Sequence, residues 1–155
     1  MKKYISRKGK IMETALDLLF PKRCPICDGI VGFRKGYVCP QCLGKIKPVN
    51  GPACMKCGKP LSDEEEYCLD CRKKKHLFCR GAAVFEYRSI AIAIYRFKYG
   101  GRQEYAFFFG KCMARRLGEQ FKRWKADALV PVPIHSSRKR ERGYNQAELL
   151  AREIS

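Results

Sequence analysis

The chain has 155 residues, and its 33 Lys and Arg against 15 Asp and Glu give a formal net charge of +18. A field of this sign favours polyanionic partners, such as nucleic acid, phosphorylated small molecules or an anionic membrane surface. The length allows about one ordinary domain. No stretch approaches the roughly 18 to 20 apolar residues of a membrane span, which excludes a transmembrane segment from the sequence.

Residues 1–21 are predicted to form a basic N-terminal segment with a short helix. The apolar run in this segment is interrupted by Glu13 and Asp17 and has no small-residue cleavage site, so we expect no signal peptide. A reducing, cytoplasmic location follows from that expectation. In such a compartment closely spaced cysteines bind metal more often than they form disulfides.

Residues 22–75 contain eight of the ten cysteines, arranged in four Cys-x-x-Cys pairs. Two such pairs give the tetrahedral sulfur cage that Zn²⁺ prefers in structural sites. The pairs also repeat as a unit, RCPICDG with GYVCPQC and then ACMKCGK with EYCLDC. The pattern predicts a double zinc ribbon with two structural zinc ions. The eight predicted ligands are Cys24, Cys27, Cys39, Cys42, Cys54, Cys57, Cys68 and Cys71.

The spacing leaves the grouping of these pairs open. The gaps between successive pairs are 11, 11 and 10 residues, so consecutive and cross-braced sites could both close. The repeat boundary between Cys42 and Cys54 favours consecutive sites. A disulfide framework or a redox Cys-x-x-Cys protein explains four pairs in register less well than zinc does. Cys79 and Cys112 stand outside the pattern and are predicted to be small buried hydrophobes.

Residues 76–155 change in composition from cysteine and turn residues to aliphatics and aromatics. Residues 81–87 predict a strand. Residues 89–99 carry isoleucines that alternate as in a strand, whereas Ile90, Ile94 and Phe97 recur at helical spacing, and we favour a helix. The pair Gly100 and Gly101 should then break the chain.

Residues 105–121 predict a second helix, because apolar side chains recur along one face. Residues 128–134 form a short apolar run with prolines, typical of a buried strand at a sheet edge. Residues 143–153 predict a third helix, with Asn145 as its N-cap and Glu148 in the capping-box position. The order of strand, helix and strand favours an α/β topology for this part.

The segment DALVPVPIHSSRKRERGYNQAELLARE, with KYGGR at residues 98–102 and LLFPKRCPIC at residues 18–27, resembles the competence protein F (ComF) family. The resemblance covers the chain from about residue 16 onward. It implies an α+β protein in which the double zinc ribbon precedes the first part of a type I phosphoribosyltransferase-like α/β domain. It also implies a bacterial protein of natural competence that acts in the cytoplasm, in contact with single-stranded DNA and the competence helicase and uptake machinery near the membrane.

One element of that family fold does not occur in the sequence. Phosphoribosyl pyrophosphate (PRPP) and Mg²⁺ are bound by two adjacent acidic residues that lead into a Thr/Gly-rich turn. The only adjacent acids here lie within residues 63–66, inside the second ribbon. We therefore expect a chain truncated before the PRPP loop, which transfers no phosphoribosyl group by itself and binds Mg²⁺ and PRPP only with a complete C-terminal domain.

The family pattern places residues 135–146 near the pyrophosphate side of such a site. This implies phosphate or nucleic-acid contacts for four cations, which are Lys98, Arg138, Arg140 and Arg142. A solvated basic loop is the alternative interpretation. His135 has no identifiable carboxylate partner and is not predicted to be catalytic.

Two functional hypotheses follow. In the first, the chain is a competence protein of phosphoribosyltransferase-like fold that is catalytically inert in this form. In the second, it is a zinc-ribbon module that binds nucleic acid or serves as an adaptor, and its C-terminal part is a docking platform.

Overall fold

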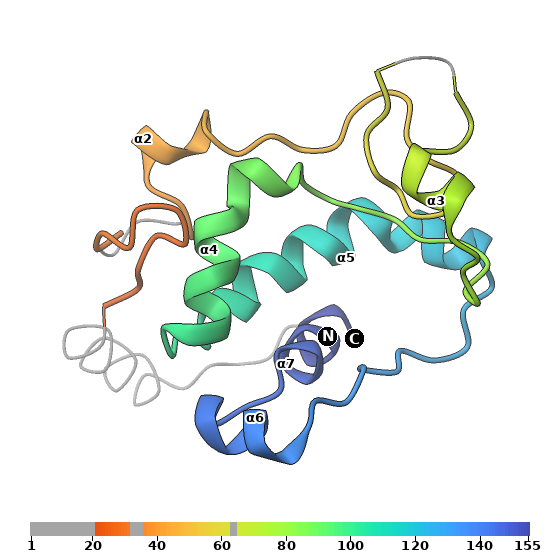
Figure 1. Cartoon of the computed structure of the whole chain (residues 1–155). Coiled ribbons are helices and arrows are strands. Elements are labelled where there is room, and N and C mark those ends of the chain that lie inside the picture. Colours follow the sequence, from red (N-terminus) through yellow and green to blue (C-terminus); the bar gives the residue numbers. More distant parts are fainter. Residues whose placement is uncertain (1–20, 32–35, 63–64) are drawn as a thin grey trace, which may run out of the picture.

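The computed structural model describes residues 21–31, 36–62 and 65–155, so the helix predicted within residues 1–21 lies outside the described part. The two ribbons come first, and helices α4 to α7 follow them (Figure 1). The helices are α2 (Pro40–Leu43), α3 (Leu69–Lys73), α4 (Tyr87–Tyr99), α5 (Tyr105–Arg123), α6 (Ser136–Arg142) and α7 (Gln146–Ile154). Among the described residues, no helix is both long enough and apolar enough to cross a bilayer.

Helices α4 and α5 confirm the two helices expected at residues 89–99 and 105–121. Each buries one apolar face, as its periodicity predicts. Gly100 closes α4, and Gly101 follows with a φ of +67°, a conformation that glycine adopts without steric cost. The buried residues are Ile90, Ala93 and Phe97 on α4 and Tyr105, Ala106, Phe108, Phe109, Gly110 and Leu117 on α5.

The strand expected at residues 81–87 is wrong, because α4 already begins at Tyr87. The residues before it are extended and pair only briefly with the linker between the ribbons. Val49 N donates to Val84 O at 3.0 Å, and Glu86 N donates to Lys47 O at 2.8 Å. This pairing forms one isolated bridge instead of a sheet.

The buried strand expected at residues 128–134 is also wrong. The segment is extended but exposed, with 82% of Val130 and 73% of Val132 accessible to solvent. Pro131 and Pro133 offer no N–H donors, and no described segment pairs with this one as a strand. The described residues thus form a mainly helical structure with isolated bridges, and they contain no α/β sheet.

Helix α7 confirms the helix expected at residues 143–153 and the N-cap role of Asn145, which accepts a hydrogen bond from Ala147 N at 3.0 Å. The Asn145 amide also donates to Val132 O at 3.1 Å and so ties α7 to the extended segment. Glu148 pairs with Arg152 at 2.5 Å on the outer surface of the helix.

Helix α6 has no counterpart among the expected elements. Its seven residues, SSRKRER, contain no apolar side chain that could reveal a period. His135 caps its N-terminus, where the ring Nδ1 accepts a hydrogen bond from Ser137 N at 3.3 Å. Gly143, with a φ of +80°, ends the helix. The capping bond gives His135 a structural role.

The core lies where α4, α5 and α7 meet. The ring of Phe97 lies 5.9 Å from that of Phe109 and 6.0 Å from that of Tyr144, and the Tyr144 hydroxyl donates to Phe97 O. Helix α7 lies directly against α5 at Gly110, where an added Cβ would lie 2.3 Å from the Cβ of Glu153. This glycine therefore sets the distance between the two helices.

A pair of glycine substitutions in α5 tests this packing. We expect Gly110→Ala to lower the free energy of unfolding by about 1–3 kcal/mol, because α7 must shift away. Gly118→Ala is the matched control, since its Cβ would meet no atom within 4 Å. It should raise stability by about 0.5–1 kcal/mol through helix propensity. Urea denaturation of the zinc-loaded proteins measures both, and equal effects at the two positions would contradict the proposed contact.

Candidate metal centres

The first ribbon presents Cys24 and Cys27 on a tight turn that its own backbone closes. Cys24 N donates to Gly29 O at 2.8 Å, and Asp28 N donates to Cys24 O at 2.8 Å. Asp28 takes a positive φ of 62°, which lets the chain reverse directly after the second cysteine. Both sulfur atoms of the pair can then face the same point.

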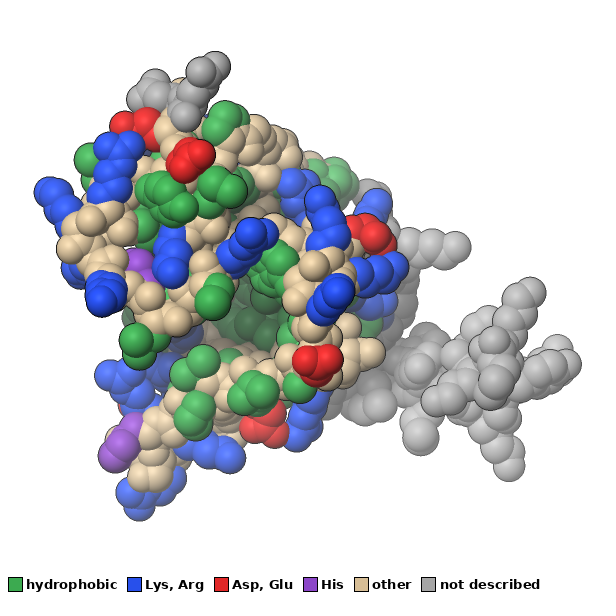
Figure 2. Space-filling model, turned by 90° about the vertical axis from the view of Figure 1, so that its right-hand side faces the viewer, with side chains coloured by type: hydrophobic (Ala, Val, Ile, Leu, Met, Phe, Trp, Pro, Cys, Tyr) green, Lys and Arg blue, Asp and Glu red, His purple; other side chains and the backbone are tan. Residues whose placement is uncertain are grey.

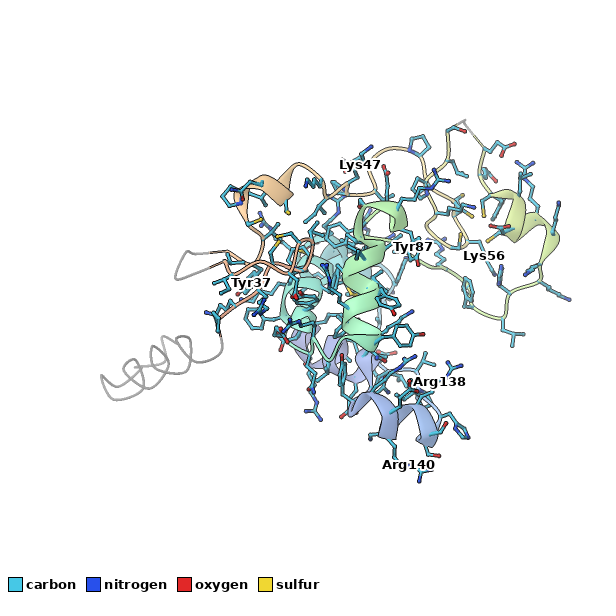
Figure 3. The ribbon with its side chains drawn as sticks, turned by 60° about the vertical axis from the view of Figure 1, so that its left-hand side comes forward. Tyr37, Lys47, Lys56, Tyr87, Arg138 and Arg140 are labelled. Carbon is cyan, nitrogen blue, oxygen red and sulfur yellow. The ribbon has the colours of Figure 1, made fainter. Side chains whose placement is uncertain are left out.

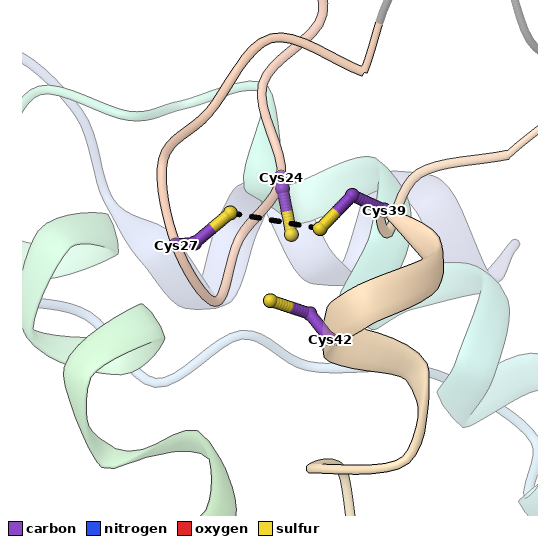
Figure 4. Close-up of side chains that lie close together, drawn as sticks. All are labelled: Cys24, Cys27, Cys39 and Cys42. Atoms are coloured by element: carbon purple, nitrogen blue, oxygen red, sulfur yellow. Dashed lines mark hydrogen bonds between the residues drawn. The ribbon is translucent and has the colours of Figure 1, made fainter.

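The second pair of this ribbon comes from α2, which has Cys39 as its N-cap and Cys42 in its single turn. The four sulfur atoms of Cys24, Cys27, Cys39 and Cys42 lie within 4.8 Å of one another, and those of Cys27 and Cys39 are 3.6 Å apart (Figure 4). A tetrahedron with Zn–S bonds of about 2.3 Å has edges of about 3.8 Å. The cluster has the size of a zinc cage.

The second ribbon repeats the two backbone hydrogen bonds that close the first metal-binding turn. Cys54 N donates to Lys59 O, and Gly58 N donates to Cys54 O, both at 2.8 Å. Gly58 has a φ of +75° and occupies the place that Asp28 has in the first ribbon. The second cluster again has its sulfur atoms within 4.8 Å of one another and consists of Cys54, Cys57, Cys68 and Cys71.

The sulfur atoms are thus grouped consecutively and not cross-braced, and all ten cysteines are free of disulfides. The two Cys₄ clusters fit two structural zinc ions. Four protein sulfurs complete a tetrahedral shell, and this leaves no position for the water or substrate that a catalytic zinc requires. The ions would supply folding energy, because such sites bind metal and fold together.

Electrostatics within the clusters favours a bound cation. Burial of the Cys24 sulfur works against ionisation, but the backbone N–H groups of Cys27, Cys39 and Ile26 outweigh it and lower the pKa of Cys24 to about 7. The same balance lowers the pKa of Cys54 to about 6. Burial and the neighbouring sulfurs raise the pKa of Cys42 and of Cys71 to about 12. Four thiolates can therefore coexist in one cluster only when a cation balances their charge.

Asp28 also connects the first ribbon to the helices. Its carboxylate accepts a hydrogen bond from the Tyr105 hydroxyl at 2.5 Å and pairs with Arg102 Nη2 at 2.7 Å. Burial tends to raise the pKa of Asp28, but these two donors outweigh it and lower the pKa. Arg96 adds a bond to Ile26 O at 2.9 Å. The metal-binding turn is thus fixed to the end of α4 and the start of α5.

The second ribbon docks through backbone contact. A Cβ at Gly58 would lie 2.7 Å from Ala82 Cα and from Ala83 N, and one at Gly81 would lie 3.1 Å from Lys56 O. The chain before α4 therefore packs directly on the second metal-binding turn. Only glycine fits these approaches without displacing backbone.

The predicted phosphate-binding cations occupy two helices. Lys98 is exposed near the end of α4, while Arg138 and Arg140 are exposed on α6. Arg142 is half-buried, and its guanidinium lies 4.7 Å from the centre of the Tyr99 ring. Their grouping into one phosphate site stays a prediction. Cys79 is exposed, which contradicts its expected burial, because residues 76–80 lie outside the core.

Comparison with known proteins identifies the first part of the chain. The double zinc ribbon domain matches residues 15–72. Competence protein F of Haemophilus influenzae is 30% identical over 144 residues, which cover 88% of this chain and 60% of that protein. The chain is similar to competence protein F over most of its length. Competence protein ComFC of Bacillus subtilis is 31% identical over 74% of this chain and 50% of its own length.

A third relative, the DNA utilization protein YhgH of Salmonella typhimurium, is 26% identical to this chain over 89% of the chain and 62% of that protein. The chain therefore spans about half to two thirds of the length of these relatives. No solved structure matches it.

The contact of Asp28 with Arg102 and Tyr105 is a functional feature that the sequence did not predict. Asp28 lies 74 positions before Arg102 and 77 before Tyr105, so no local pattern connects it to them. One feature of the sequence could have indicated a special role for Asp28. An acidic residue follows CPIC at the place where the second repeat has a glycine, which marks a position with an additional role.

The zinc grouping can be tested by native mass spectrometry of cysteine-to-serine variants. We expect about two zinc ions in the wild-type chain and about one in the variant that lacks both pairs of the first ribbon. The variant that lacks the first pair of each ribbon should bind none. Cross-braced sites would reverse the last two outcomes. Cys79→Ser, outside both clusters, is the control and should keep both ions.

The hydrogen bond between Tyr105 and Asp28 can be tested with Tyr105→Phe. Loss of the hydroxyl leaves Asp28 with one donor fewer, and we expect the free energy of unfolding to fall by about 1–3 kcal/mol. The zinc of the first ribbon should also pass faster to a chelator. Tyr87→Phe is the control, because that side chain is 68% exposed. Equal zinc-release rates for Tyr105→Phe and the wild type would show that this hydrogen bond does not stabilise the zinc site of the first ribbon, contrary to our expectation.

Proposed function

We propose that this protein handles transforming DNA during natural competence, and that its zinc ribbons are structural supports. The observation that carries the proposal is the extent of the similarity to competence protein F, which runs through the ribbons and the helices over 144 residues. The name of a further relative, DNA utilization protein, supports a role with DNA. The protein acts in the cytoplasm beside the helicase and uptake machinery.

The helical part is, in this proposal, the beginning of a type I phosphoribosyltransferase-like domain. Its support is the family-like sequence of residues 98–102 and 127–153. A PRPP site would need adjacent acids followed by a Thr/Gly-rich turn, and the sequence contains no such segment. The activity proposed for these residues is therefore DNA binding and not transfer of a phosphoribosyl group.

The charge of the protein supports single-stranded DNA as the partner. Lys and Arg side chains are spread over much of the face seen in Figure 2, with few acidic side chains between them. Even with eight thiolates and two zinc ions the formal charge stays at about +14. Cations that neutralise phosphates release bound counterions, so affinity for a nucleic acid falls steeply with salt.

The second candidate is a zinc-ribbon module that binds nucleic acid itself. Its support is the basic run at residues 72–75, which lies on and after α3 in the second ribbon. The packing of both metal-binding turns against the rest of the chain favours the first proposal. Asp28 bonds to Tyr105 at the start of α5, and Gly58 packs on residues 82–83 before α4.

Two triple variants separate the candidates by fluorescence anisotropy with a single-stranded oligonucleotide. One replaces Arg138, Lys139 and Arg140 of α6 by glutamine, and the other replaces Lys73, Lys74 and Lys75 of the second ribbon, so that both variants have the same net charge. The slope of log affinity against log salt falls by about 0.7 for each phosphate that the protein no longer neutralises. We expect a smaller slope for the α6 variant and an unchanged slope for the ribbon variant.

The reverse pattern would favour the zinc-ribbon module as the DNA-binding part. Absence of binding by the zinc-loaded wild-type chain at low salt would contradict both candidates. Each variant should retain its zinc and its helix content, since the replaced side chains are exposed and bind no metal.

A further inference from the structure

The outer face of α4 carries three exposed tyrosines, which we call the tyrosine face. Tyr87, Tyr95 and Tyr99 are 68%, 63% and 56% exposed. At 100° per residue they lie within about 120° of one another around the helix, opposite the side that enters the core. The first and last are separated by about 18 Å along the axis. Single exposed aromatics are common, whereas three on one helix face indicate a binding surface.

Two of these rings are held in place. The rings of Tyr95 and Tyr99 lie 5.1 Å apart at an interplanar angle of 44°. Arg142, at the end of α6, lies 4.7 Å from the Tyr99 ring and also bonds to Gln146 Oε1 at 3.3 Å. The rings thus lose little additional freedom on binding and still expose more than half of their surface.

Positive charge surrounds the tyrosine face. Arg88 and Lys98 are exposed on the same side of α4, and this helix contains no acidic residue. Tyr87 projects from one end of α4, and α6 with Arg138 and Arg140 lies beyond the other end (Figure 3). Alternation of aromatic rings and cations suits a ligand that presents flat apolar groups and negative charges together.

We propose that the tyrosine face is the surface on which bases of single-stranded DNA stack, while the neighbouring cations contact its phosphates. The inference rests on the proposed function and adds the site and the mode of binding. Stacking on aromatic rings accepts any base, because every base has a π-face. A duplex keeps its bases stacked on one another, so this surface selects single strands. The residues assigned to it are Tyr87, Tyr95, Tyr99, Arg88, Lys98 and Arg142.

The test measures the DNA affinity of proteins with and without the tyrosine rings, on single strands with and without bases. We expect Tyr95→Ala with Tyr99→Ala to weaken binding of a mixed-sequence single strand by about 5-fold or more for each ring removed. The salt dependence should not change, because no cation is removed. On an abasic strand of the same length, wild type and variant should bind equally. Tyr95→Phe with Tyr99→Phe is the matched control and should bind as the wild type does, since the aromatic rings remain.

The outcomes separate this inference from the proposed function. Binding of the wild type with no loss in the alanine variant would overturn the tyrosine face and leave the DNA role intact. An equal loss on intact and abasic strands would also overturn stacking. Absence of any single-strand binding would overturn the proposed function and the inference together. Tyr87→Ala, at the other end of α4, is a second variant with the same expected loss, and zinc content and circular dichroism verify the fold of each.

Discussion

The bond between the Tyr105 hydroxyl and the Asp28 carboxylate connects the two halves of this molecule. Tyr105 is only 1% exposed, so its hydroxyl needs an acceptor within the protein. Asp28 can be that acceptor because the turn that presents two zinc ligands also fixes its backbone. Metal binding, the shape of the turn and the position of α5 therefore depend on one another. Stabilisation by zinc extends in this way from the ribbon to the helices.

The two ribbons share one backbone design but use it differently. The residue after the first metal-binding turn is Asp28, which reaches the helices with a charged side chain. Its counterpart is Gly58, whose missing side chain lets residues 82–83 pack against the turn. The same position of the repeat therefore docks each ribbon in a different way, through a charged side chain in the first and through close backbone packing in the second. Both depend on the positive φ that the turn requires.

Local sequence patterns predicted the parts of the structure that depend on interactions between residues close together in the sequence. The cysteine spacing identified both clusters, the apolar period identified α4 and α5, and the Asn145 cap identified the start of α7. Neither expected strand is present, because a strand must pair with a neighbouring strand. Within the described part of the chain, residues 81–87 form only one bridge and residues 128–134 form none. The tyrosine face was also not recognised, because apolar periodicity identifies the buried side of a helix and not the aromatics opposite it.

The long separation between Asp28 and Tyr105 has a consequence for biosynthesis. The 77 positions between them correspond to roughly 4 to 15 s of translation at about 5–20 residues per second. During that interval the emerging first ribbon has no helix to pack on, and its thiols are protected only if zinc is already bound. A cell short of zinc would therefore expose these cysteines to oxidation before the protein is complete, and sulfinic or sulfonic acids formed then would be irreversible lesions.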